Sequence, residues 1–186
     1  MTQSGPILQT PRLTLRLPRV GDIDNIYNLA RDRRVHRFML LPWPYRKEHA
    51  AGLVLLAKNQ LKSRTGYHFL VTSRKTGEVY GVIGLACGRK IDRHAEVGYW
   101  LGPNHWGQGY ASEALSAALA FAFRRLKLVR VWARSVPANK VSARMLRRAG
   151  FKSEGTLRKH RLIQGKWHDE RQWGILRDEY LNTLPR

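Results

Sequence analysis

Residues 95–123 read AEVGYWLGPNHWGQGYASEALSAALAFAF. The stretch begins with an apolar, aromatic run at 95–101 and continues through a segment at 102–109 that holds three glycines and a proline. From Ala111 to Leu126, small and apolar side chains then recur at intervals of three and four residues, which predicts a helix with one buried face. The stretch therefore predicts a strand, a loop and a helix.

The loop before this helix predicts a site for an anion. The first backbone N–H groups of a helix have no partner inside it, and the helix dipole places partial positive charge there. Gly107 and Gly109 allow the backbone to turn tightly and to approach a bulky group, and Ser112 adds a hydroxyl. The predicted ligand is a phosphate or a pyrophosphate, although a plain connection between strand and helix would also use such glycines.

Two common phosphate-binding motifs are absent from the sequence. A P-loop requires Lys-Ser or Lys-Thr after a glycine, and no glycine here is followed in that way. A dinucleotide fingerprint requires a third glycine where Ser112 stands, and an acidic residue at the end of the next strand. The next predicted strand, VRVWARS at 129–135, contains no acidic residue. Neither a P-loop nor a dinucleotide site is expected.

Three segments resemble the GNAT superfamily of acetyl-CoA-dependent N-acetyltransferases, and within it the RimJ/RimL-type group. They are EVGYWL at 96–101, WGQGYASEA at 106–114 and NKVSARMLRRAGFKSEG at 139–155. Residues 10–30 and 162–170 resemble the ends of the same group, so the likeness covers nearly the whole chain.

The resemblance implies a mixed α/β fold. Its central, mostly antiparallel sheet would be splayed between two parallel strands and flanked by helices, in a single domain over residues 1–186. It also implies direct transfer of an acetyl group from acetyl-CoA, as cosubstrate, to a primary amine, with no metal and no nucleophilic cysteine.

The composition limits the class and the location of the protein. A chain of 186 residues that is 43% hydrophobic can bury a substantial core, which excludes a disordered protein. No apolar run approaches the ~20 residues that span a bilayer, and the first residues lack the pattern of a signal peptide, so no membrane association is expected. The single Cys87 cannot form an internal disulfide, which suits a reducing compartment and predicts a cytoplasmic protein, monomeric or homodimeric.

The net charge is unusually positive. Thirty-four Lys and Arg against 13 Asp and Glu give +21, more than the phosphates of coenzyme A require. Such a surface would attract the ribosome or another nucleic acid without regard to sequence. The basic residues are nevertheless spread along the chain, which is typical of a solvated surface, and both interpretations remain open.

The remaining pattern predicts further elements around this centre. Strands are expected at 12–17, 67–72, 78–86 and 128–135, helices after Asp22, at 47–61 and after Asn139, and a last hairpin of 151–164 and 166–176 about Gly165. Residues 35–46 contain Pro42 and Pro44, which exclude a regular helix interior. In the resembled family this segment lines the acceptor pocket, which makes Phe38, Trp43 and Tyr45 candidates for substrate contact, although core packing explains each of them equally well.

The resemblance also assigns residues to the cofactor. The backbone of the glycine loop would bind the pyrophosphate, through Trp106, Gly107, Gln108, Gly109, Tyr110, Ala111 and Ser112. The family signature [Gln/Arg]-x-x-Gly-x-[Gly/Ala] fits this loop except at Trp106. The N–H of Val97 would stabilise the oxyanion, and Asn139 would bind the pantetheine amides or cap the following helix.

The catalytic residues follow from the same resemblance. Ser142 would be the general acid, because Leu146 stands where many other GNAT enzymes have a tyrosine. Some relatives place a glutamate base at the position of Arg161, which leaves Glu96 and Glu154 as the candidate carboxylates.

The strength of the base that is needed depends on the acceptor. An α-amine, with a pKa of ~7.7–8.0, is roughly 10% neutral at pH 7, whereas a lysine amine at ~10.4 is neutral to about 0.04%. The missing glutamate therefore favours a protein or peptide N-terminal α-amine. The alternatives are a small-molecule amine such as an antibiotic or an amino acid, and a catalytically weak CoA-binding protein that docks on RNA or the ribosome.

Overall fold

One eight-stranded sheet carries the structure, a computed structural model that describes residues 5–39 and 41–182. The strand order is β1-β2-β3-β4-β5-β6-β8-β7, and every neighbouring pair is antiparallel except β5 and β6, which are parallel. The strands are β1 (Leu8–Gln9), β2 (Leu13–Arg16), β3 (Gly66–Ser73), β4 (Val79–Cys87), β5 (His94–Leu101), β6 (Arg130–Ser135), β7 (Lys152–Ile163) and β8 (Lys166–Leu176). The predicted mixed α/β fold with a mostly antiparallel sheet is confirmed.

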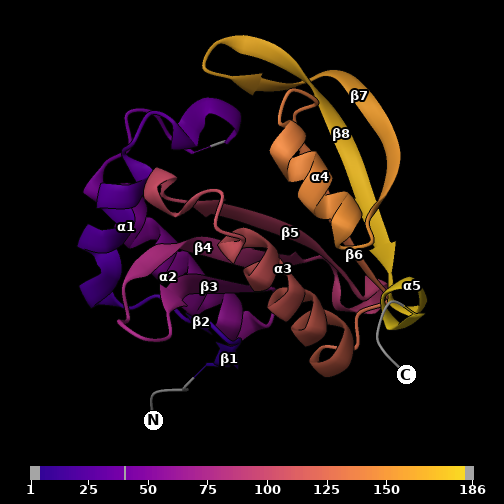
Figure 1. Cartoon of the computed structure of the whole chain (residues 1–186), viewed down its shortest axis with the longest axis horizontal. Helices are drawn as coiled ribbons and strands as arrows, with labels where there is room; N and C mark the ends of the chain where they lie inside the picture. Colours follow the sequence, from indigo (N-terminus) through magenta and orange to yellow (C-terminus); the bar gives the residue numbers. More distant parts are fainter. Residues whose placement is uncertain (1–4, 40, 183–186) are drawn as a thin grey trace.

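Helices cover both faces of this sheet (Figure 1). They are α1 (Ile23–Ala30), α2 (Lys47–Ser63), α3 (Tyr110–Ala120), α4 (Lys140–Arg148) and α5 (Arg177–Asn182), and a π-helical segment, Phe121–Arg125, directly follows α3. Because side chains alternate along a strand, Phe69 packs in the cluster under α3 and α4, whereas its neighbour Leu70 packs in the cluster under α1 and α2. Both side chains are fully buried, which stabilises the fold by about 1.5–3 kcal/mol each.

Most of the predicted elements are found, with small shifts at their ends. Gly165, at the predicted turn of the last hairpin, and Gly77, in the turn between β3 and β4, have φ of +75° and +76°, a region that favours glycine. Asn139 caps α4 as predicted, because its Oδ1 accepts a hydrogen bond of 3.1 Å from the N–H of Ser142. Asp22 does not cap α1; its buried carboxylate instead accepts hydrogen bonds from the Arg16 guanidinium.

The two parallel strands separate part of the way along, as the family resemblance predicts. Their register runs from His94 opposite Arg130 to Glu96 opposite Trp132 and ends there. Strand β5 nevertheless stays paired with β4 as far as Leu101, and β6 stays paired with β8 as far as Ser135. The sheet is therefore closed at one end of the β5–β6 pair and open at the other.

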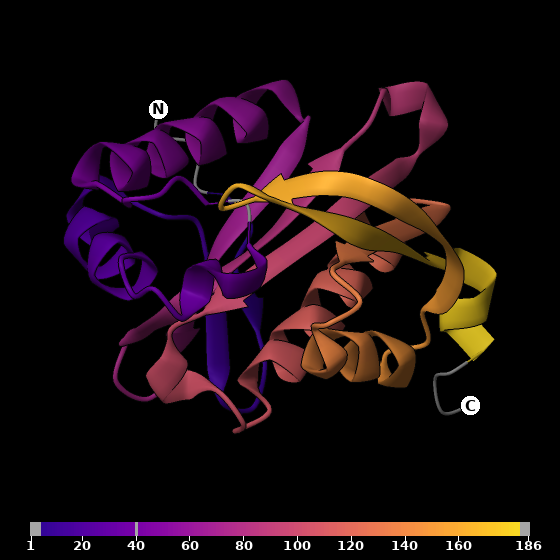
Figure 2. The same ribbon diagram turned by 90° about the horizontal axis from the view of Figure 1, so that it is seen from above.

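The β7–β8 hairpin forms the far edge of the sheet. It arches away from the sheet past α4, and its tip extends over the rest of the molecule (Figures 1 and 2). The pairing of its two strands is irregular, with register shifts between Ser153 and Gly155 and between Leu157 and Arg161. This curvature brings the half of the hairpin nearest its turn back toward the opening between β5 and β6.

Among the described residues, no helix is long and apolar enough to cross a membrane.

Candidate active site

A pocket of about 220 Å³ lies where β5 and β6 separate. Its walls come from both parallel strands, the start of α4, the segment after α1 and the β7–β8 hairpin, and they include Phe38, Met39, Glu96, Val97, Gly98, Tyr99, Arg134, Ser135, Val136, Asn139, Ser142, Arg161, Ile163 and Glu170. Pockets that enclose a whole drug-sized ligand are about 300–1,000 Å³. This pocket is smaller, which suits the reacting ends of two substrates rather than either one entire.

The start of α3 has the geometry of an anion site. Gly107 and Gly109 have φ of +73° and +80°, and the space around a Cβ at Gly107 is open. Among the described residues, none accepts a hydrogen bond from the backbone N–H groups of 107–112. These N–H groups, together with the helix dipole, are suited to a pyrophosphate.

Side chains of the loop before α3 bind to nearby backbone and side chains and so fix the shape of the loop. The Trp106 Nε1–H donates to the carbonyl of Leu101 at 2.7 Å, and the Gln108 amide donates to the carbonyl of Asn104 at 2.9 Å. The ring of Tyr110 lies against the guanidinium of Arg12, 4.6 Å from the ring centre. A ligand at this loop would therefore be bound mainly by the backbone.

Glu113 lies in the first turn of α3, where nearby hydrogen-bond donors offset its negative charge and so reduce its repulsion of an anion. Its carboxylate accepts hydrogen bonds from the Thr10 hydroxyl at 2.6 Å and from the Arg12 side chain at 2.7 Å. Burial would raise the pKa of Glu113, but these hydrogen bonds outweigh it and lower the pKa. The same contacts fasten the start of α3 to the turn between β1 and β2.

A pair of hydroxyl groups faces the pocket. The Tyr99 and Ser142 oxygens lie 2.8 Å apart, and either hydroxyl can donate to the other. Burial raises the pKa of Tyr99 to about 12, so the phenol keeps its proton at neutral pH. The pair can therefore pass a proton toward the pocket.

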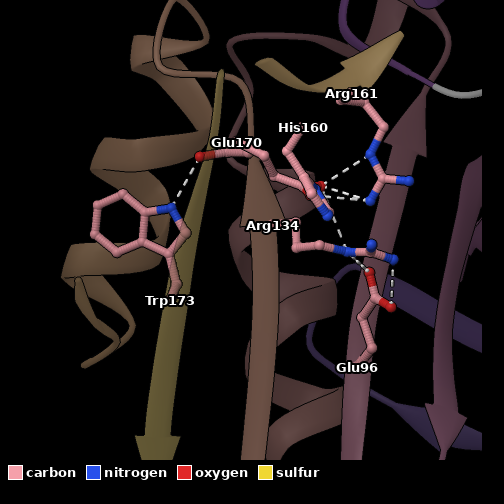
Figure 3. A network of polar contacts seen from close by, with 7 residues as sticks. Glu96, Arg134, His160, Arg161, Glu170 and Trp173 are labelled. Atoms are coloured by element: carbon pink, nitrogen blue, oxygen red, sulfur yellow. Dashed lines mark hydrogen bonds and ion pairs between the residues drawn. The ribbon is translucent and has the colours of Figure 1, made fainter. Parts of the chain in front are cut away.

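Charged side chains on β5, β6 and the hairpin form a connected network (Figure 3). Arg134 donates two hydrogen bonds to Glu96, of 2.8 and 2.7 Å, and its Nε lies 3.5 Å from Glu170. Glu170 is 4% exposed and also contacts Arg161, at 2.7 Å, and the His160 ring, at 2.5 Å. Glu96 and Glu170 thus both line the pocket, and each is paired with an arginine.

The structure brings five of the predicted site residues together. Phe38, Glu96, Val97, Asn139 and Ser142 all line the pocket. Val97 is the first residue of β5 beyond the part paired with β6, as its predicted role in oxyanion binding requires.

Three other predicted residues lie elsewhere. Glu154 forms an ion pair with Arg130, which lowers the pKa of the carboxyl, and does not line the pocket. Tyr45 is 6% exposed and packs with the core beneath α1 and α2. Trp43 is 49% exposed and packs its ring edge-on against His36, with the ring centres 4.7 Å apart.

Sequence reasoning did not select Tyr99, Arg134 or Glu170. The sequence could have indicated Tyr99, because residues two apart on a strand share a face and Val97, two residues earlier, was a candidate. Leu146, in contrast, is fully buried in the core, so the tyrosine position of other family members does not open onto this pocket.

A sheet that opens between two parallel strands, beside a helix start suited to an anion, is the arrangement expected of the acetyltransferases that the sequence resembles. Residues 12–152 match the family model described as the acetyltransferase (GNAT) domain. The chain belongs to this family and is an N-acetyltransferase.

The relatives of this chain include an uncharacterized N-acetyltransferase and two enzymes whose named acceptors differ. The chain is 31% identical over 173 residues to the uncharacterized N-acetyltransferase p20 of Bacillus licheniformis, which covers 93% of this chain and 97% of that protein. It is 32% identical over 171 residues to the ribosomal protein uS5-alanine N-acetyltransferase of Escherichia coli K12, with 87% and 86% covered. The crystal structure of spermidine N-acetyltransferase from Vibrio cholerae, in complex with CoA and spermine, matches with a TM-score of 0.82 at 26% identity, covering 93% of this chain and 100% of that one.

Proposed function

We propose that this N-acetyltransferase transfers the acetyl group of acetyl-CoA to the N-terminal α-amine of a protein or peptide. The observation that carries the proposal is the Tyr99–Ser142 hydroxyl pair in the opening between β5 and β6. The pair stands beside the backbone of Val97 and the carboxylate of Glu96. A proton donor, an oxyanion donor and a proton acceptor therefore share one small pocket.

The donor substrate fits the chain on both sides of the opening. The N–H groups of 107–112 suit the pyrophosphate of coenzyme A. Asn139 uses its oxygen to cap α4, and within the described part of the chain its amide nitrogen has no partner, so it can donate to a pantetheine carbonyl. The CoA bound in the related spermidine N-acetyltransferase supports this assignment.

The chemistry requires a carbon–nitrogen bond to form while a carbon–sulfur bond breaks. The amine lone pair attacks the carbonyl carbon of the thioester that acetyl-CoA supplies. The N–H of Val97 donates to the carbonyl oxygen as negative charge develops there. Ser142 gives its proton to the departing sulfur and regains one from Tyr99, and the phenol then recovers its proton from solvent. The proton of the amine leaves through water toward Glu96.

The acceptor assignment follows from how Glu96 is held. Both of its oxygens already accept hydrogen bonds from Arg134, so the guanidinium already balances its negative charge. An α-amine, roughly 10% neutral at pH 7, needs little help to lose its proton, whereas a lysine amine needs far more. The relative that acetylates the alanine of ribosomal protein uS5 supports the same choice.

Thiol release from acetyl-CoA tests the proposal. The panel contains short peptides with free Ala, Ser or Met N-termini, N-blocked peptides with an internal lysine, and spermidine. We expect turnover with the free N-termini, a loss of turnover in Ser142→Ala and a smaller loss in Glu96→Gln. Turnover confined to spermidine would refute the acceptor, and full activity in both variants would refute the mechanism.

A further inference from the structure

Two arginines that line the pocket each have an unused donor group. Arg161 holds Glu170 through Nε and Nη2, and Arg134 holds Glu96 through the same two atoms. Within residues 5–39 and 41–182, Nη1 of neither side chain has a hydrogen-bond partner, and Figure 3 shows each guanidinium with one nitrogen that carries no contact. The two side chains are only 21% and 29% exposed.

Unused donors on residues that line the pocket are available to an acceptor atom on the substrate. A guanidinium has five N–H groups and no acceptor capacity, so only an oxygen or another electron-rich atom can satisfy Nη1. The carboxylates hold the other edge of each guanidinium, which fixes its plane and leaves its free edge directed elsewhere. The arginines are thus preorganised rather than mobile.

We propose that Arg161, with Arg134 beside it, donates a hydrogen bond to the carbonyl oxygen next to the acceptor amine. The substrate class is then an amine on the carbon that bears a carbonyl group, as at the N-terminus of a peptide. This inference rests on the proposed function and adds the group by which that acceptor is recognised.

The charges in the pocket agree with this substrate class. Two arginines and two glutamates line it, so their formal charges cancel. An acceptor with one amine and a neighbouring carbonyl brings at most one positive charge into the pocket, and its carbonyl can accept from the free edge of a guanidinium. A polyamine carries additional ammonium groups, which would meet Arg161 without an unpaired carboxylate to offset them.

The test compares two peptides that differ in their first peptide bond, in the wild-type protein and in a variant without the proposed contact. One has a free N-terminal alanine and an ordinary first peptide bond; in the other, a trans alkene replaces that bond, which keeps the length and removes both the carbonyl and the amide N–H. The part of the preference that Arg161→Gln abolishes is then the part due to the contact with Arg161. The wild-type protein is expected to prefer the ordinary peptide in kcat/KM by about 10- to 100-fold, the range for a hydrogen bond from a charged donor. Arg161→Gln is expected to reduce that preference to within a few-fold of one.

Variants separate substrate binding from a structural role. Arg161→Lys keeps a positive charge beside Glu170 but has no second edge, so we expect wild-type thermal stability with most of the preference lost. Arg158→Gln is the matched control and should keep the preference, because Arg158 is exposed on the same strand and forms no ion pair with a residue that the structure describes. A preference unchanged in Arg161→Gln, with the ordinary peptide still acetylated, would overturn this inference alone. Failure to acetylate any free N-terminus would overturn the proposed function as well.

Discussion

Removal of either hydroxyl in the Tyr99–Ser142 pair should slow acetyl transfer, and removal of both should add little. A general acid contributes about 10²- to 10⁴-fold, so Ser142→Ala is expected to lower kcat about 100-fold. Tyr99→Phe leaves the serine in place but removes its donor at 2.8 Å, and a tenfold loss is expected, about 1.4 kcal/mol. The double variant should resemble Ser142→Ala, because both groups act on one proton.

The assay is thiol release at saturating acetyl-CoA and peptide. Tyr67→Phe, a change to a partly buried tyrosine on β3, is the control and should leave kcat unchanged. Since burial raises the pKa of Tyr99 to about 12, its proton is retained below about pH 10, and kcat should show no loss attributable to the phenol there. Losses that multiply to about 1,000-fold in the double variant would show two independent roles and refute the relay.

Two further changes probe the anion loop and the acid stability. Gly109→Ala places a Cβ at a left-handed φ of +80°, so it should lower the free energy of unfolding by about 1 kcal/mol and raise the KM for acetyl-CoA. Gly77→Ala, at φ of +76°, is the control: thermal melting should show the same loss of stability, and the KM should not change. Burial raises the pKa of Asp22, but Arg16 and a backbone N–H outweigh this and lower it from 3.8, so the stabilisation is present above pH 3.8 and is lost as the pH falls below it. Asp22→Asn should therefore lower the free energy of unfolding in urea by about 2 kcal/mol at pH 7, less than for a fully buried pair because Arg16 is 23% exposed. The difference between variant and wild type should narrow toward pH 3, and a difference that is constant with pH would exclude this pair as its cause.

The elements of the fold were predictable because local patterns specify them. The small residues from Ala111 onward repeat with the helical period, and Gly165 marks the last hairpin. The point at which β5 leaves β6 was not predictable from local pattern. The apolar, strand-forming sequence continues past Glu96 to Leu101 without a break, so the end of the pairing depends on tertiary packing.

The site was predictable where a motif or a cap defines it. Ser142 follows its capping residue Asn139 by three positions, and both line the pocket. The network around Glu170 depends on the register of β6 against β8, which a single sequence does not show. Glu154 and Glu170 lie on the two strands of one hairpin, yet Glu154 pairs with Arg130 at the start of β6 and Glu170 lies beside Arg134 near its end.

The opening between β5 and β6 links the stability of the protein to its substrate. Backbone groups of Val97 and beyond lack a neighbouring strand on that side, so a bound molecule with amide groups of its own would take the place of the missing strand. Binding to the native state alone adds about 2.7 kcal/mol at a ligand concentration 100 times its Kd. Hydrogen exchange in the presence of coenzyme A should then slow more in the second half of β5 than in α1 and α2.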